Sequence, residues 1–179
     1  MTARDTYATI KNLRATRFFL SKPLERADLE AILEAGRWTG SSKNVQGWTL
    51  VVFEDAAGRE RIATAGDFTN PVRNSVATIA LVKNPEGNDF DIGRLAQNLM
   101  LAAATRGVGS CPVTLHHTDV AREVLGLSDG QSCKYAVAFG YPDPEAEEAS
   151  RAKRRAAGTT GRKPAEDMIR RDGRAASNT

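Results

Sequence analysis

Apolar residues recur every three or four positions along several stretches of the chain, the spacing that places them on one face of an α-helix. The clearest stretch is Asp91 to Arg106, whose middle is apolar nearly all round and which Gly107 ends, so it predicts a central buried helix. The same reasoning predicts further helices over these ranges: Ala3 to Leu13, Arg26 to Trp38, Arg59 to Ala65, Asp119 to Leu125, Glu145 to Ala157 and Pro164 to Arg171. The last two are polar.

Short apolar runs bounded by turn residues predict strands. They cover Trp48 to Glu54, Val76 to Lys83, Pro112 to Leu115, and Lys134 to Phe139. Neither an internal repeat nor a separate linker interrupts this order. The pattern therefore predicts one α+β domain over residues 1–179, rich in helices around a small central sheet.

Composition and charge exclude several classes of protein. Hydrophobic residues make up 41% and charged residues 26% of the 179 residues, which is typical of a globular protein in water. No run of eighteen apolar residues exists, and the start at Met1 lacks the apolar stretch of a signal peptide, so we expect a cytoplasmic protein without a membrane span. From Glu145 onward, nine basic and six acidic residues account for the whole formal charge of +3, a balance too mild to indicate nucleic-acid binding.

The cysteines and histidines offer little chemistry. Cys111 and Cys133 lie far apart without a CxxC spacing, which favours free thiols over a disulfide. Cys111 with His116 nearby could form a nucleophile and base, but an inert buried thiol is the favoured interpretation. The adjacent His116 and His117 would point to opposite faces of a strand, so no transition-metal site is expected.

Three polar clusters remain, and each alone is typical of a solvated surface. They are the basic pair Arg14 and Arg17, the loop with Ser41, Ser42, Asn44 and Gln46, and the basic pair Arg162 and Lys163. Cations of this kind bind a phosphate group when they are gathered in space, because arginine offers a forked donor.

The order of these segments resembles the FMN-dependent nitroreductase family over residues 10 to 170. Four segments carry the resemblance: Arg14-Ala-Thr-Arg17 with Lys22-Pro23, Gly40-Ser-Ser-Lys-Asn-Val-Gln-Gly-Trp48, Asp91 to Gly109 with its Gly-Val-Gly end, and Phe139-Gly-Tyr-Pro142 with Gly161-Arg-Lys-Pro164. The resemblance implies a mixed, mostly antiparallel sheet flanked by helices, in a homodimer with two FMN sites at the subunit interface. It also implies that the tail, about residues 145–179, packs on the partner subunit.

The resemblance assigns the cofactor contacts residue by residue. It implies that the phosphate is held by Arg14, Arg17, Arg162 and Lys163, and that polar atoms of the ribityl chain and ring are held by Ala15, Thr16, Ser41, Ser42, Asn44 and Gln46. The serine-rich loop would come from the partner subunit. The segment Pro112, Val113, Thr114, Leu115 would run under the ring, with Thr114 and Leu115 near the reactive N5 atom. Either Arg17 or Lys43 could supply a donor near the N1/O2 edge.

The activity implied is ping-pong transfer of hydride from NAD(P)H to flavin N5 and then to a nitroaromatic, quinone or enone. It requires no catalytic acid or base from a side chain. Two alternatives stay open: a flavin enzyme of the same fold that acts on a specific metabolite without nicotinamide, and a dimeric binding or accessory protein that lacks flavin. Gly40 and Gly47 stand where the family usually has proline, and Leu115 where many members have glycine. We therefore expect a looser loop and narrower access above N5.

Overall fold

The computed structural model of the chain describes residues 3–171, with side chains from residue 6 onward. The chain divides into two compact units, one that ends at Glu147 and one that begins at Glu148. The strands described below and the helices α1 to α6 belong to the first unit. Whether the second unit packs on a partner subunit stays a prediction.

Four strands form one antiparallel sheet in the order β1-β2-β4-β3. The strands are β1 (Trp48–Phe53), β2 (Ala77–Lys83), β3 (Gly109–Thr114) and β4 (Ser132–Gly140). Ala15 adds an isolated parallel bridge to Ser110 on β3. The predicted mixed, mostly antiparallel sheet is thus confirmed, and β3 lies at its edge with only this short segment beside it.

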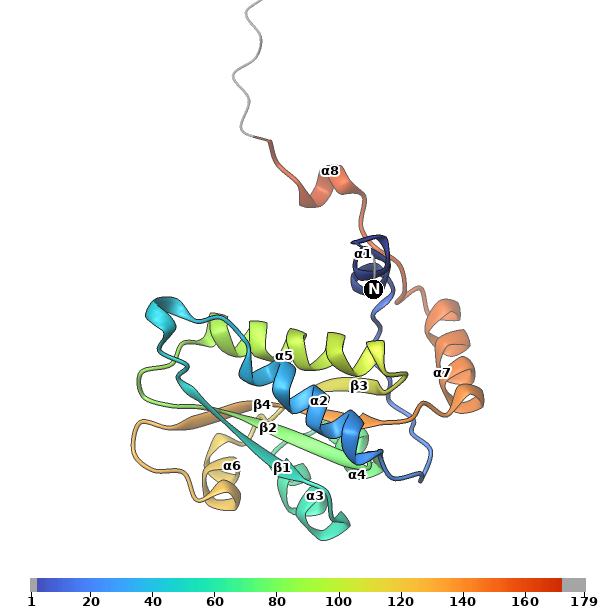
Figure 1. Ribbon diagram of the computed structural model, residues 1–179. Helices are drawn as coiled ribbons and strands as arrows, with labels where there is room; N and C mark the ends of the chain where they lie inside the picture. Colours follow the sequence, from blue (N-terminus) through green and yellow to red (C-terminus); the bar gives the residue numbers. More distant parts are fainter. Residues whose placement is uncertain (1–2, 172–179) are drawn as a thin grey trace, which may run out of the picture. The chain divides into compact units, whose positions relative to one another are not determined.

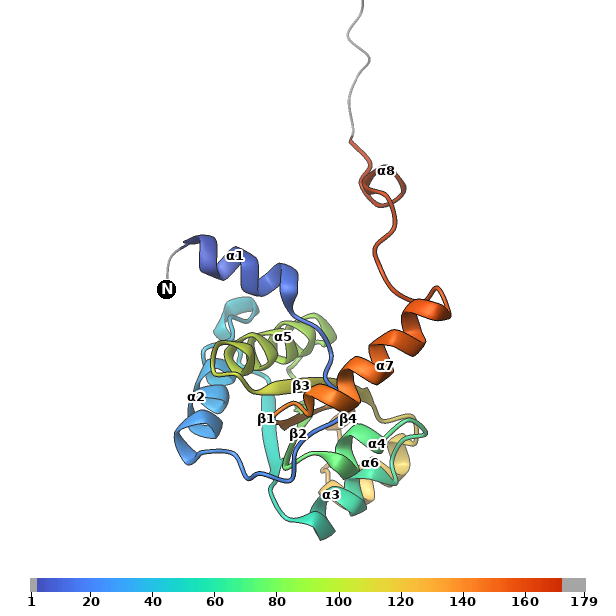
Figure 2. The ribbon, with the colours of Figure 1, turned by 90° about the vertical axis from the view of Figure 1, so that its right-hand side faces the viewer.

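Helices cover both faces of the sheet (Figure 1). On one face lie α2 (Arg26–Arg37) and α5 (Asp89–Thr105), and on the other α3 (Ala56–Ala63), α4 (Asn70–Asn74) and α6 (Thr118–Leu125). The first helix, α1 (Ala3–Asn12), lies beside α5 (Figure 2). A three-layer α/β/α unit follows, with the central helix of the sequence prediction in one outer layer.

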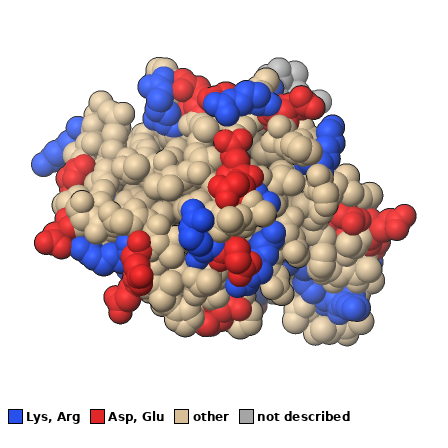
Figure 3. All heavy atoms as spheres, turned by 90° about the horizontal axis from the view of Figure 1, so that it is seen from below, with Lys and Arg blue, Asp and Glu red and all other residues tan. Residues whose placement is uncertain are grey.

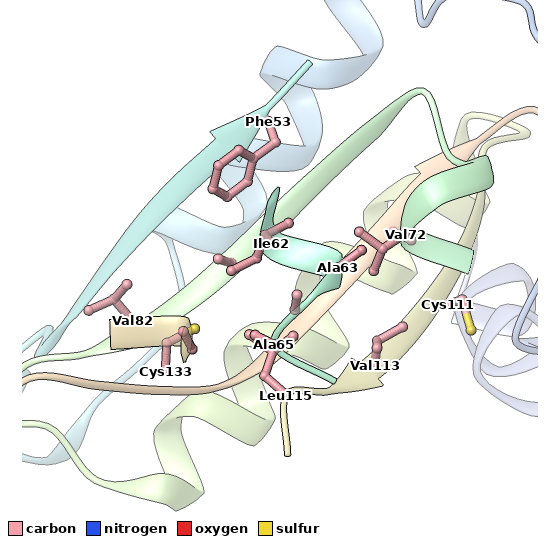
Figure 4. Packing of buried hydrophobic residues seen from close by; sticks show 14 residues of the cluster. Phe53, Ile62, Ala63, Ala65, Val72, Val82, Cys111, Val113, Leu115 and Cys133 are labelled. Atoms are coloured by element: carbon pink, nitrogen blue, oxygen red, sulfur yellow. The ribbon is translucent and has the colours of Figure 1, made fainter. Parts of the chain in front are cut away.

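Alternation along the strands divides the buried side chains into two clusters. On the α3 and α6 side, Cys111, Val113 and Leu115 of the third strand and its continuation pack with Ile62 (Figure 4). On the α2 and α5 side, the cluster contains the following fully buried residues: Ile32, Ile79, Leu95, Leu99, Val137 and Phe139. Each face of the sheet therefore has its own apolar core, which fixes the register of the strands.

Most predicted elements are confirmed with shifted ends, and two short helical elements were missed: α4 and the 3-10 turn Ser42–Asn44. α3 begins three residues before the predicted Arg59, because the Asp55 carboxylate accepts a hydrogen bond from the Gly58 amide at 2.7 Å and caps the helix. The five-residue α4 falls where a loop was predicted, since Pro71 in its first turn resembles a turn signal. β3 starts at Gly109, earlier than the predicted Pro112.

The second unit holds the end of α7 (Pro144–Ala156) and the short α8 (Ala165–Met168). Side chains from residue 155 to 171 are exposed.

On the face drawn in Figure 3, acidic and basic side chains are interspersed rather than gathered into a field of one sign. Within residues 3–171, none of the helices is long and apolar enough to cross a membrane.

Candidate functional site

An extended segment after α1, residues 14–20 and called the arm below, is fastened along the edge of the sheet. The Thr16 amide donates to the Ser110 carbonyl at 2.8 Å, beside the Ala15–Ser110 bridge. Farther along, the Leu20 amide donates to the Tyr141 carbonyl at 2.9 Å. These backbone bonds place the arm alongside the start of β3 and alongside the residues that follow β4.

A glycine allows the arm to approach the strand this closely. A Cβ atom on Gly109 would lie 2.7 to 2.8 Å from three side-chain atoms of Thr16, whose side chain is itself buried at 5% exposure. Any larger residue at position 109 would therefore push the arm away from β3.

A buried carboxylate also holds the arm. Glu147, in the first turns of α7, is only 2% exposed. Its Oε1 atom accepts hydrogen bonds from the backbone amides of Arg17 and Phe18, the second at 3.0 Å. Because 130 positions separate Glu147 from Arg17 in the sequence, no local pattern could have predicted this contact.

The two arginines of the arm are exposed, and their donors are only partly used within the chain. Arg14 donates through Nη1 to the Lys11 and Leu13 carbonyls at 2.7 and 2.8 Å, at the end of α1. Arg17 makes a weaker contact from Nη1 to the Ala15 carbonyl at 3.5 Å. Both guanidinium groups keep further N–H donors that could bind an anion at the edge of the sheet.

The open edge of β3 presents backbone polar groups next to the arm. In an antiparallel pair, alternate residues point their N–H and C=O groups toward and away from the partner strand. The Leu115 amide donates toward β4, to the Lys134 carbonyl at 2.9 Å, whereas the Ser110 carbonyl faces the arm. The Thr114 amide therefore faces the open edge, about 14 Å along the strand from Ser110 at the usual rise per residue.

Side chains of the predicted ring-binding segment divide between the two faces. Pro112 and Thr114 are exposed on the same side as Ser110. Val113 and Leu115 are buried in the cluster under α3 and α6, Leu115 at 1% exposure. The expectation that Leu115 narrows access above the ring is wrong, because period-two alternation sends this side chain into the core.

Ser110 places a buried polar group at this edge of the sheet. Its hydroxyl is buried, at 2% residue exposure, and it makes no hydrogen bond to any group of the described residues. A buried hydroxyl without a partner is costly, and the arm beside it carries cations. Donors, cations and an open backbone edge match the phosphate, hydroxyls and ring amide groups of FMN, so the residues fit this cofactor.

The serine-rich loop is ordered by its own hydrogen bonds. The Ser41 hydroxyl accepts from the Gln46 amide at 2.8 Å, and the Gln46 side chain donates to the Asn44 carbonyl at 3.3 Å. Lys43, Asn44 and Gln46 have positive φ angles of 51°, 55° and 52°. Ser42 and its neighbours through Gln46 are exposed, so their polar groups are available to a ligand.

The loop lies at the opposite end of α5 from the arm. A Cβ on Gly40 would lie 2.8 Å from Arg94 in the first half of α5, whereas the arm meets Gly109 just after that helix ends. The seventeen residues of α5 span about 25 Å. One copy of the chain therefore does not bring Ser41, Ser42, Asn44 and Gln46 together with Arg14 and Arg17.

Gly47 has a packing role that explains its departure from the family pattern. A Cβ on Gly47 would lie 2.5 Å from the Gly87 Cα, and the Gly47 carbonyl accepts from the Asn84 amide at 3.1 Å. Proline would place ring atoms in this contact. The glycine here reflects close packing rather than the looser loop that we expected.

Arg162 and Lys163 belong to the second unit, and both are exposed. Arg162 donates to the carbonyl of its neighbour Gly161 at 2.9 Å. Their predicted contact with the phosphate stays a prediction.

Both histidines contact Asp67, and both cysteines lie in the interior. Both cysteines, Cys111 and Cys133, are buried, and desolvation raises the pKa of Cys133 to about 11. His116 Nδ1 accepts from the Asp67 amide at 3.3 Å, and His117 Nε2 lies 2.8 Å from the Asp67 carboxylate. Among residues 3–171, no group of three or more His, Cys, Asp or Glu side chains could hold a metal ion.

Comparison with known proteins fixes the family. The chain matches the Nitroreductase family over residues 10–67 and 72–141, which is most of its length. This chain belongs to the nitroreductase family. A relative from Archaeoglobus fulgidus, whose name provisionally assigns it as NADH dehydrogenase/NAD(P)H nitroreductase, is 25% identical over 143 residues, covering 74% of this chain and 82% of that protein.

Solved nitroreductase structures share the fold. A structure from Parabacteroides distasonis with the same provisional description has a TM-score of 0.79 at 20% identity, over 94% of this chain and 98% of that one. An NADPH:FMN oxidoreductase from Vibrio harveyi, solved with NAD+, has a TM-score of 0.80 at 21% identity, over 97% of this chain and 80% of that one. This family member therefore has the fold that the sequence predicted.

Proposed function

We propose that this nitroreductase family member is an FMN-dependent oxidoreductase that takes hydride from NAD(P)H and passes it to a nitroaromatic, quinone or enone by ping-pong exchange. The observation that carries the proposal is the fastening of the arm to β3, which brings Arg14 and Arg17 to the same strand as Thr114. Relatives named NAD(P)H nitroreductase and NADPH:FMN oxidoreductase support it.

The two ends of the open edge of β3 would bind different parts of the cofactor. At the Ser110 end, Arg14, Arg17 and the Thr16 hydroxyl bind the phosphate and the start of the ribityl chain. At the other end, the Thr114 amide would donate to the ring, and Pro112 and the backbone of Val113 would lie beneath it. Bound FMN supplies the two-electron chemistry. The chain orients the cofactor and the substrates, and a proton comes from solvent.

The site requires two copies of the chain. The loop from Ser41 to Gln46 is built to offer polar groups but lies at the far end of α5 from the arm of its own copy. A two-fold partner would bring its loop to this arm and complete the site, as in an isologous dimer. The proposed assembly is therefore a homodimer with FMN at the interface.

An apolar surface supports the dimer. Around a hollow of about 420 Å3 between α1, α2 and α5, the side chains of Ile10, Trp38 and Leu101 gather, and Trp38 is 74% exposed. An exposed apolar patch of this kind marks an interaction site. Burial against the same helices of a second copy would remove it from water. We further propose that Arg162 and Lys163 contribute to binding of the phosphate.

The absorption spectrum of the purified protein is the first test. We expect a flavin spectrum that NADPH or NADH bleaches under anaerobic conditions, and that a nitroaromatic or quinone restores. Flavin that nicotinamide never bleaches, while a specific metabolite does, would remove the NAD(P)H step. The double variant Arg14→Ala, Arg162→Ala should lose FMN, and unchanged flavin content would contradict the phosphate assignment.

A further inference from the structure

A hollow lies along the first half of α5, beside the serine-rich loop. It has a volume of about 430 Å3 and is lined by Asp89, Phe90, Gly93, Arg94, Gln97 and Asn98. Along the helix it adjoins the apolar hollow of the proposed dimer surface, because Asn98 lines both. None of the cofactor contacts assigned above falls on this hollow, so its side chains are available for another role.

The serine-rich loop is fastened to this part of α5. Asn98 Nδ2 donates to the hydroxyl of Thr39 at 2.9 Å, and Thr39 is only 3% exposed. At the next position, a Cβ atom on Gly40 would lie 2.8 Å from Arg94 Nη2, and Figure 1 shows the loop beside the beginning of α5. Any side chain at position 40, including the proline that is usual in the family, would displace the guanidinium. The glycine therefore leaves room for Arg94 at the base of the loop.

Arg94 can be reached from solvent and keeps donors that the chain does not use. Its side chain is 46% exposed, and its Nη1 atom lies 3.5 Å from Asp91 Oδ1, at the long limit of a hydrogen bond. A guanidinium offers five N–H donors, so most of them stay available to a ligand. Arg94 Cζ lies 5.8 Å from the centre of the Phe90 ring, which is 75% exposed. An accessible cation and an accessible aromatic ring are thus neighbours in this hollow.

The two acids beside the arginine have partners of their own. Asp89 lies 2.8 Å from the Lys83 ammonium and 3.6 Å from that of Lys134, and the hydrogen bond from Lys83 is the main cause that lowers its pKa. The side chain of Asp91 is only 7% exposed and accepts from Asn88 Nδ2 at 2.7 Å. Among the lining residues and their ion partners, three cations therefore accompany two carboxylates. The hollow has an excess of one positive charge.

We propose that this hollow binds the adenosine phosphate end of the nicotinamide nucleotide, an inference that rests on the proposed function. A phosphate group accepts forked, charge-assisted hydrogen bonds from Arg94. The adenine base stacks on the exposed face of Phe90, and the exposed Gln97 amide bonds to the ribose or the base. The volume falls within the range of about 300 to 1,000 Å3 that is usual for ligand pockets.

The place of the hollow beside the loop fits this ligand. In the proposed homodimer the serine-rich loop meets the arm of the partner, and the hollow at the base of the loop comes to the border of the same site. The nicotinamide end of the nucleotide has to reach the ring-binding end of the open edge, whereas the adenosine phosphate end extends away from it. A quinone or nitroaromatic has no such extension. Arg94 and Phe90 therefore distinguish the reductant from the acceptor, although both use the same ring-binding edge.

Calorimetric titration of the full chain saturated with FMN tests the proposal without any turnover. The ligands are AMP, whose phosphate is common to NADH and NADPH, 2′-AMP, whose phosphate only NADPH carries, and inorganic phosphate, all at constant ionic strength. We expect saturable binding of at least one nucleotide, more tightly than inorganic phosphate. Arg94→Met should weaken it at least about tenfold and Phe90→Leu at least about fivefold.

Arg26→Met is the matched control. Arg26 is an exposed arginine at the start of α2 that pairs with Glu30, so this variant loses the same charge away from the hollow and should bind the nucleotide normally. Arg94→Lys keeps the charge without the fork and should have intermediate affinity. Absence of saturable nucleotide binding by the unaltered protein would overturn the proposal, as would equal affinity in the Arg94→Met and Arg26→Met variants, or inorganic phosphate that binds as tightly as the nucleotides.

Steady-state kinetics separate this proposal from the proposed function. Arg94→Met should raise the KM of the nicotinamide nucleotide about tenfold and leave kcat and the KM of a quinone unchanged, because the contact is remote from the reacting atoms. An unchanged nucleotide KM would contradict the role of Arg94 while the oxidoreductase activity stands. If neither NADH nor NADPH bleaches the bound flavin, the proposed function is wrong, and the titrations still decide whether the hollow binds a nucleotide.

Discussion

Removing the Glu147 carboxylate tests how the arm is held. In Glu147→Ala, the backbone amides of Arg17 and Phe18 lose the acceptor Oε1. An unsatisfied buried amide costs about 1 to 3 kcal/mol. Two partly buried amides lose their acceptor, which destabilises the fold, whereas the variant no longer buries a charge, which offsets part of that cost. We therefore expect a net loss of about 2 to 4 kcal/mol in the free energy of unfolding.

The effect should extend to the cofactor. A loosened arm no longer presents Arg17 beside Ser110, so FMN should dissociate more readily from Glu147→Ala. Glu147→Gln keeps a carbonyl oxygen in the same place and should retain most of the stability and the affinity. Urea unfolding and quenching of flavin fluorescence measure the two quantities.

The neighbouring residue gives a matched control. Glu148 is exposed and forms an ion pair with exposed Arg155. Such pairs contribute little, so Glu148→Ala should leave both measurements unchanged. If Glu147→Ala unfolds at the same urea concentration as the unaltered protein and binds FMN equally well, the reasoning about the arm is refuted.

Three further predictions concern single positions. Gly109→Ala should lower the free energy of unfolding by about 1 to 3 kcal/mol in urea titrations, because its Cβ would overlap Thr16; stability equal to the unaltered protein would show that the arm can shift freely. The hydrogen bond from Arg106 is the main cause that lowers the pKa of Asp28 in the folded protein. The ionised Asp28 carboxylate therefore adds stability above its unfolded pKa, near 4, and this stability is lost as pH falls through the folded pKa. Asp28→Asn should make the melting temperature depend less on pH in this acid range. With its pKa near 11, Cys133 should resist a thiol reagent at neutral pH until urea unfolds the chain, and rapid labelling of the folded protein would contradict its burial.

Local periodicity predicted the elements well, since each depends on nearby residues. The central helix from Asp91 and the strands around Leu50 and Val137 are confirmed because their apolar patterns match the two cores. The short α4 was missed, because five residues around Pro71 are too few to show a helical period.

The residues of the candidate site were also predicted only in part from the sequence. Arg14, Thr16 and Thr114 could be proposed from a resemblance because they stand in recognisable segments, and the structure places them along one strand edge. Glu147 could not, since it is an acid within a charged helix. Its significance comes from burial and from partners distant in the sequence.

A mixed dimer tests the central claim that two copies build each site. One chain carries Arg14→Ala with Arg17→Ala, and the other carries Ser41→Ala with Asn44→Ala. The two are coexpressed with different tags, and the heterodimer is purified for measurement of its flavin content. Each variant alone should lack flavin, and the heterodimer should hold one FMN, because one of its two sites joins an intact arm to an intact loop. A heterodimer as empty as its parents would contradict the claim.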